Sequence, residues 1–96
     1  MTKSELIEQL TTTNDMLNKR EAEMIVNTIF DGIGQALIDG DRVEIRGFGS
    51  FTVRQRDARE ARNPKSGTIV SIPDKKTPFF KTGKELRERV NGGIVD

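Results

Sequence analysis

Basic side chains are concentrated in one stretch of this chain, where they could contact a polyanion. Residues 46–84 hold ten Lys and Arg against three Asp and Glu, whereas residues 1–45 hold four against nine. The ten basic residues are Arg46, Arg54, Arg56, Arg59, Arg62, Lys65, Lys75, Lys76, Lys81 and Lys84. The net charge of +1 hides this division. An acidic half and a basic half in one short chain indicate a nucleic-acid partner for the basic half.

A proline stands in the middle of the basic stretch, in the run Arg62-Asn63-Pro64-Lys65-Ser66-Gly67. Pro fixes φ and Gly tolerates positive φ, so the run predicts a turn. A rigid apolar ring between two cations could enter a minor groove and wedge between base pairs, while the cations hold the flanking phosphates. A proline in a turn is more often only a turn residue, so both interpretations stay open.

The residues around this turn predict a long β-hairpin from about Arg54 to Lys76. Arg54 and Arg56 share a face at strand spacing, whereas Arg59 and Arg62 fall outside it, so we expect a twist or bulge to re-aim them. A long hairpin with mostly polar side chains has little core of its own, so it must be stabilised by contact with another surface, and its arginines suggest a phosphate backbone. The alternative is a solvated hairpin that serves only as a soluble edge.

The run Gly47-Phe48-Gly49-Ser50-Phe51 has two interpretations. Aromatic rings beside glycines could stack on the bases of a single strand. We favour the simpler interpretation, in which Phe48 and Phe51 are core residues and the glycines connect two strands. The run lacks the terminal Gly-Lys-Ser/Thr of a phosphate-binding loop.

The composition argues against enzymatic chemistry. The chain has no Cys and no His, which excludes thiol and imidazole ligands and nucleophiles. The carboxylate pairs Asp39/Asp41 and Glu85/Glu88 are explained by helix ends and solvated ion pairs. We therefore expect no enzyme, no catalytic residue, no metal site, no cofactor and no small-molecule substrate. The absence of a signal peptide or a long apolar run predicts a cytoplasmic protein that binds no membrane.

Two helices are predicted in the first half. Thr2 with Glu5 forms a capping box for a short helix, which the run from Thr11 to Asn14 should weaken into a turn. Asn18 with Glu21 forms a second capping box, and apolar residues at three- and four-residue steps carry a longer helix to about Ile38. Its apolar surface is wider than a surface helix needs, which indicates subunit packing.

The second half changes to strand periodicity. Val43 and Ile45 alternate with charged residues, and a further strand begins near Phe51. Pro78 predicts an edge position or a bulge in the returning strand because it has no N–H for a ladder. Thr82 is expected to cap a last helix that ends at Asn91-Gly92-Gly93.

Taken together, these segments resemble the HU/integration host factor family of bacterial histone-like proteins over nearly the whole chain. Four runs carry the resemblance: residues 1–7, 43–51, 62–67 and 80–86. The resemblance implies an α+β fold: an intertwined dimer with a helical base, a small antiparallel sheet and a long β-hairpin DNA-binding arm per subunit. It implies one domain over residues 1–96, divided into a base and first strand (1–46), a sheet with the arm at about 54–76 (47–82), and a C-terminal helix (83–92).

The resemblance also implies an architectural protein that binds double-stranded DNA through the minor groove and bends or compacts it, with Pro64 intercalating. Nucleoid organisation, recombination and transcription would be its settings. The partner subunit is either a second copy or a related chain. The implied DNA-binding residues are Lys3, Glu44, Arg46, Arg54, Arg56, Arg59, Arg62, Asn63, Pro64, Lys65, Lys75, Lys76 and Lys84.

The run Glu44-Ile45-Arg46 is more similar to the beta subunit of integration host factor than to HU, which implies that Glu44 and Arg46 favour certain sites. Ala61 departs from the Gly that is usual before Arg-Asn-Pro, and the tail 92–96 extends past the usual end. Two other functions remain open: a non-bending protein that coats or bridges DNA on the same fold, and a protein–protein module whose basic hairpin binds an acidic partner.

Overall fold

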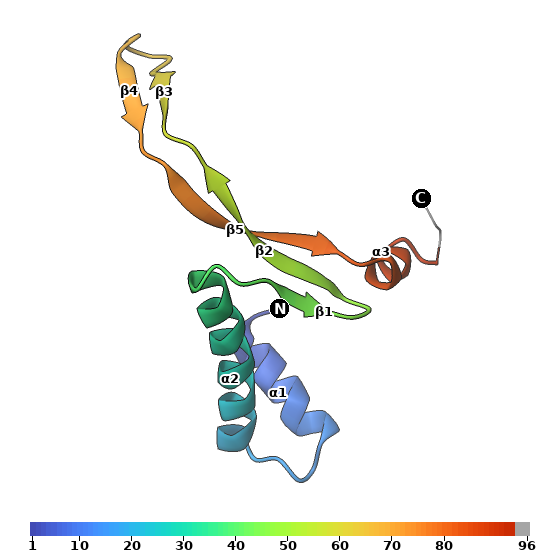
Figure 1. The fold of residues 1–96 in the computed structure, drawn as a ribbon. Coiled ribbons are helices and arrows are strands. Elements are labelled where there is room, and N and C mark those ends of the chain that lie inside the picture. The colour runs from blue at the N-terminus through green and yellow to red at the C-terminus, as the bar shows by residue number, and fades with distance from the viewer. Residues whose placement is uncertain (94–96) are drawn as a thin grey trace. The chain divides into compact units, whose positions relative to one another are not determined.

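The computed structural model describes residues 1–93, which form three helices and five strands in an α+β arrangement (Figure 1). The chain divides into two compact units, Met1–Ala36 and Leu37–Asp96. The first helix and the second helix up to Ala36 make up the first unit, and the strands and the last helix belong to the second. Residues 94–96 of the tail 92–96 lie outside the described residues.

In the first unit, α1 (Lys3–Thr13) packs against α2 (Lys19–Ile38). Both capping boxes predicted from the sequence are confirmed at their backbone bonds. The Glu5 N–H donates to Thr2 Oγ1 at 3.2 Å, and the Glu21 N–H donates to Asn18 Oδ1 at 2.8 Å. The Asn18 N–H also donates to Glu21 Oε1 at 3.2 Å, so the second box is reciprocal.

The turn expected from Thr11 is wrong, because the helix continues through Thr13. The hydroxyls of Thr11 and Thr12 donate to the Glu8 carbonyl at 2.8 and 2.9 Å, and the Thr13 hydroxyl donates to the Gln9 carbonyl at 3.0 Å. These bonds back to the preceding turn let threonine remain in a helix. The helix ends only at Asn14, whose backbone is extended.

The buried core of the described residues is small. It consists of Ile7, Ala22 and Val26, with Leu6 and Leu10 partly buried against it. Larger apolar side chains of α2 remain exposed, among them Met24 at 61% and Phe30 at 55%. Many large apolar side chains of the single chain therefore remain exposed to water.

In the second unit, β1 (Val43–Ile45), β2 (Gly49–Arg56) and β5 (Lys75–Thr82) form an antiparallel sheet in the order β1-β2-β5. Beyond it, β3 (Arg59–Arg62) pairs with β4 (Ile69–Ile72). Pro78 lies in β5, which is an edge strand, so the edge position predicted from the missing N–H is confirmed.

Gly49 allows β2 and β5 to approach closely at the base of the sheet. It is buried, and a Cβ there would lie 2.5 Å from the Lys81 carbonyl oxygen and 2.6 Å from the Phe80 ring. The Phe80 ring packs against Phe51 at 4.8 Å and Phe48 at 5.4 Å between centroids. The rings thus pack against one another, as the simpler interpretation expects, but the prediction that Phe48 is a core residue is wrong for the single chain, because Phe48 stays 44% exposed and Phe51 is only partly buried.

The last helix, α3 (Lys84–Val90), begins differently from the prediction. Thr82 is the final residue of β5, and its hydroxyl donates to the Gly83 carbonyl at 3.1 Å. Gly83 occupies the N-cap without a side-chain bond, and its own N–H donates to the Phe48 carbonyl at 2.9 Å. The helix ends at Asn91, followed by Gly92 and Gly93 with positive φ, as the glycines predicted.

Candidate nucleic-acid interface

One register runs through the entire hairpin. From the pair of Gly49 with Thr82 to the pair of Arg62 with Ile69, the two residue numbers always add up to the same value. No residue is inserted on either strand, so the expected bulge is absent. Because side chains alternate between the two sides of a strand, Arg62 lies on the same side as Arg54 and Arg56, against the expectation. Of the two arginines in β3, Arg59 lies on the other side.

The register defines one face of the β2–β5 ladder, which we call the cationic face. Its members are the cross-strand pairs Ser50/Lys81, Thr52/Phe79, Arg54/Thr77 and Arg56/Lys75. On β1, Glu44 lies on the same face because it pairs with Ser50. The opposite face carries the pairs Phe51/Phe80 and Val53/Pro78, and Lys76 lies on that side beside Gln55. The ladder thus brings Arg54, Arg56 and Lys75 together but separates Lys76 from them.

Lys81 belongs to the cationic face but is not among the predicted site residues. The signal is present in the sequence, since Lys75, Thr77, Phe79 and Lys81 alternate at a spacing of two along β5. Sequence reasoning misses it because Pro78 interrupts the pattern of a regular strand at this point.

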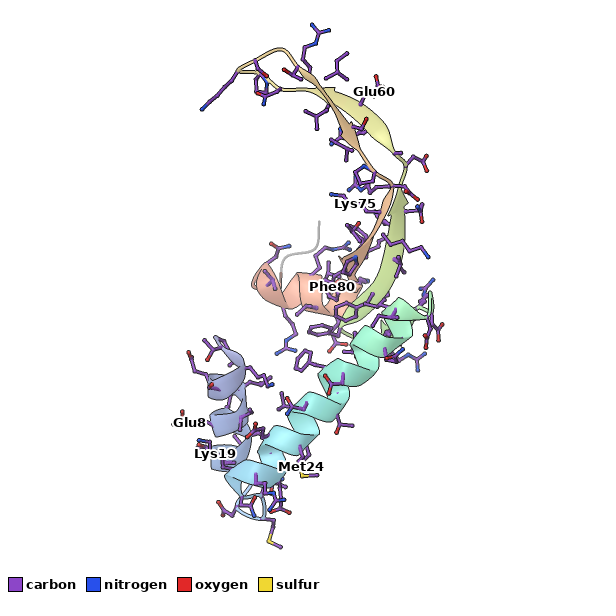
Figure 2. The ribbon with its side chains drawn as sticks, turned by 90° about the vertical axis from the view of Figure 1, so that its left-hand side faces the viewer. Glu8, Lys19, Met24, Glu60, Lys75 and Phe80 are labelled. Atoms are coloured by element: carbon purple, nitrogen blue, oxygen red, sulfur yellow. The ribbon has the colours of Figure 1, made fainter. Side chains whose placement is uncertain are left out.

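Farther along the arm, two arginines of β3 face aliphatic residues of β4. Arg59 pairs with Ile72 and Arg62 pairs with Ile69. An arginine stem can pack along such a neighbour and leave its guanidinium in water. Glu60, which belongs to this ladder, lies toward the tip, whereas Lys75 lies midway along the hairpin and Phe80 near its base (Figure 2).

The tip is held by backbone and side-chain bonds that leave Pro64 exposed. The Asn63 N–H donates to the Thr68 carbonyl at 2.8 Å, and the Gly67 N–H donates to the Asn63 carbonyl at 2.8 Å. Asn63 Oδ1 accepts from the Lys65 N–H at 2.9 Å. Gly67 adopts φ +73°, which glycine allows. Pro64 is presented by a closed turn, with Lys65 next to it in the chain.

The ladder is interrupted between the two sheets. Asp57 and Ala58 on one strand, and Pro73 and Asp74 on the other, lie between the paired segments, and the register places Asp57 opposite Asp74. Pro73 has no N–H to donate, and like charges at facing positions destabilise strand pairing. These two features account for a break that does not change the register.

A hollow open to solvent lies at this break. Three cationic side chains line it together with one carboxylate and neutral neighbours: Arg56, Arg59, Lys75, Asp57, Ile72, Pro73 and Thr77. Arg59 therefore lines the same hollow as Arg56 and Lys75, although strand alternation places it on the opposite side from Arg56.

Within the described part of the chain, the cations of the hairpin lack carboxylate partners. In residues 1–93, the structure shows ion pairs for Arg42 with Glu44 at 3.6 Å and for Lys84 with Glu88 at 3.7 Å, and none between a carboxylate and a cation of residues 54–81. Arg46 is exposed in the turn after β1. Lys3 is the first residue of α1 in the first unit. The hairpin thus presents positive charge that an external anion can neutralise.

No group of His, Cys, Asp and Glu side chains in residues 1–93 is arranged to hold a metal ion. Within the same range, none of the helices combines the length and the apolar character that a membrane span requires.

Comparison with known proteins points to one family. The family model "Bacterial DNA-binding protein" matches residues 1–91. A cocrystal structure of HU with DNA from Anabaena is 38% identical and has a TM-score of 0.83, with 94% of this chain and 97% of that chain covered. HU from Thermotoga maritima is 32% identical with a TM-score of 0.66, covering 94% and 98%. A mutant of transcription factor 1 is 23% identical with a TM-score of 0.63, covering 96% and 92%, and shows only the shared fold.

The register places Asp57 opposite Asp74 at the break, where neither residue is paired, and this generates a prediction. Replacing Asp57 with Asn removes the like-charge pair with Asp74 and should stabilise pairing of the outer arm by roughly 0.2–1 kcal/mol. Amide hydrogen exchange in β3 and β4 should then become slower. Glu60→Gln is the control, because Glu60 faces Ser71. Equal exchange rates for Asp57→Asn and the unchanged protein would show that the carboxylates do not weaken the ladder.

Proposed function

Because this chain belongs to the family of bacterial DNA-binding proteins that includes HU, we propose that it binds duplex DNA with its hairpin in the minor groove and bends it. The observation that carries the proposal is the cationic face, where Arg54, Arg56 and Lys75 lie together and form no ion pair with a carboxylate of residues 1–93. Structural DNA-binding proteins of this kind are not enzymes, and we propose the same of this chain. We expect it to act at the nucleoid.

We expect different groups of cationic residues to contact different parts of the duplex. Phosphate contacts supply most of the affinity of such proteins and carry no sequence information. We assign Arg54, Arg56, Lys75 and Lys81 to the groove walls, and the hollow at the break to a backbone phosphate. Arg62, Asn63 and Lys65 would hold the duplex around the tip. Lys3, Arg46, Lys76 and Lys84 remain candidates for contacts on the flanking DNA.

Glu44 with Arg46 remains the proposed source of site preference. Glu44 lies on the cationic face, and its carboxylate forms an ion pair with the Arg42 guanidinium. A carboxylate on a DNA-facing surface repels phosphates, so it selects positions where it can accept a bond from a base. Preference for particular sites would suit roles in recombination and transcription.

Pro64 would be the wedge at the end of each arm. Minor-groove wedges that kink the duplex by partial unstacking are already known from the HU and integration host factor family, so the mechanism is transferred to this chain through its tip sequence. Here the exposed ring stands on a closed turn between Arg62 and Lys65. Sharp bending of a 20–30 base-pair site costs on the order of 1–6 kcal/mol, which the phosphate contacts along the arm would offset.

The small core supports a second subunit. A chain whose buried apolar residues are Ile7, Ala22 and Val26, while Phe30 and Phe48 stay 55% and 44% exposed, leaves large apolar surfaces uncovered. Surfaces of this kind mark interfaces. We propose that the chain dimerises through them, with a second copy or a related subunit, and that the two compact units then act as one DNA-binding domain.

Dimerisation can be tested by sedimentation equilibrium of the purified chain, which has a mass of 10.8 kDa. We expect about twice this mass for the unchanged protein. Phe30→Asp should shift the protein to the monomer, because it places a charge on the exposed apolar side of α2. Met16→Asp is the control. Met16 is also exposed, at 87%, but it lies in the loop that connects α1 to α2 and not on the apolar side of α2. A monomeric unchanged protein would point to a related partner chain.

The phosphate contacts predict a steep salt dependence of duplex affinity. The logarithm of the binding constant should fall linearly with the logarithm of salt concentration, and Arg56→Gln should reduce the slope by about 0.9 for each phosphate that it leaves without a cation. Lys19→Gln is the matched control, because Lys19 begins α2 in the acidic half of the chain. A flat salt response of the unchanged protein would contradict DNA binding by the cationic face.

The wedge predicts that Pro64→Ala weakens bending more than binding. Energy transfer between dyes at the two ends of a duplex should report less shortening with the variant, at protein concentrations that saturate the DNA. Lys65→Ala is the control, since it should reduce affinity while a saturated complex stays bent. Equal shortening by Pro64→Ala and the unchanged protein would favour a non-bending role for the tip.

A further inference from the structure

Phe79 is an aromatic residue on the cationic face, whose other residues are polar or charged. Its neighbours on that face are serine, threonine and cations, whereas Phe51 and Phe80 lie on the opposite face. The Phe79 side chain is only partly buried. Its ring does not join the aromatic cluster formed by Phe48, Phe51 and Phe80. The apolar core therefore does not explain an aromatic residue at this position.

The ring has one specific partner. Arg54 Cζ lies 3.3 Å from the centroid of the Phe79 ring. The two residues are diagonal neighbours across the ladder, because Arg54 pairs with Thr77 and Phe79 pairs with Thr52. A guanidinium over an aromatic face is attracted by the negative charge density of the ring. Diagonal neighbours in an antiparallel sheet lie within reach of aromatic and long side chains.

This stacking leaves the hydrogen-bond donors of Arg54 available. The five N–H groups of a guanidinium lie in its plane, so a ring that covers one face of the plane uses none of them. An unrestrained arginine loses rotamer entropy when it binds, and a restraint present before binding reduces that loss. The ring thus fixes a cation without neutralising it.

We propose that Phe79 is a positioning residue for DNA: it holds the Arg54 guanidinium in place on the cationic face, ready to donate to a phosphate or base edge. The inference rests on the proposed function, since it concerns how the same surface binds duplex DNA. Phe79 contributes to affinity only through Arg54. Two other roles for the ring, direct contact with DNA and general support of the sheet, predict different results.

A double-mutant cycle tests the proposal, with duplex affinity measured at one fixed salt concentration. Phe79→Leu should weaken binding about two- to fivefold for each arm, the range set by exposed cation–π contacts. In an Arg54→Gln background, Phe79→Leu should have no further effect. In an Arg56→Gln background, it should cause the same loss as in the unchanged protein, because Arg56 does not stack on the ring. Phe79→Tyr retains a ring and should restore full affinity.

Thermal unfolding of each variant separates positioning from support of the sheet. We expect Phe79→Leu to change the midpoint by no more than Thr77→Ala, a substitution on the same strand face. If Phe79→Leu lowers it further, Phe79→Met replaces it in the cycle. Equal affinity losses in the presence and absence of Arg54 would overturn the proposal. Failure of the unchanged protein to bind duplex DNA would instead overturn the proposed function.

Discussion

The uninterrupted register of the hairpin is the constraint on which the rest of the second unit depends. Because every pair from Gly49/Thr82 to Arg62/Ile69 follows the same register, no side chain changes faces through an inserted residue. A slip of one residue would exchange the two faces of a strand. It would move Arg54 and Arg56 to the side of the Phe51/Phe80 cluster. The position of Arg54, Arg56 and Lys75 on the face opposite the Phe51/Phe80 cluster is thus a consequence of strand pairing.

The base of the hairpin fixes this register. Gly49 leaves room for the Lys81 carbonyl and the Phe80 ring, and no other residue could take its place without a shift of the backbone. The Gly83 N–H donates to the Phe48 carbonyl, which ties the end of β5 to the turn before β2. The tip is closed by backbone bonds of Asn63 and Gly67. Between these two ends, the ladder can break at Asp57 and Asp74 without losing its alignment.

Much of this arrangement can be predicted from the sequence. The capping boxes at Thr2 and Asn18 are predictable because a side chain that bonds three residues away acts locally. The turn at Pro64 follows from the backbone preferences of Pro and Gly. The α+β class and the family follow from the order of these segments. The continuation of α1 through Thr13 is not predicted, because threonine has a low helix propensity and its bonds to carbonyls three and four residues back do not show in the sequence pattern. The N-cap of α3 at Gly83 is not predicted, since the Gly83 N–H donates to the carbonyl of Phe48, which is distant in the sequence.

By itself the sequence determined the two capping boxes, the basic stretch and the turn at Pro64, because each depends on residues close together in the chain. Only the tertiary structure decided which cations share a surface. Cross-strand pairing placed Lys81 on the face of the predicted arginines, put Lys76 on the other side and brought Arg54 over Phe79. These neighbours are more than 20 residues apart in sequence, and their meeting depends on a register that strand periodicity alone leaves open.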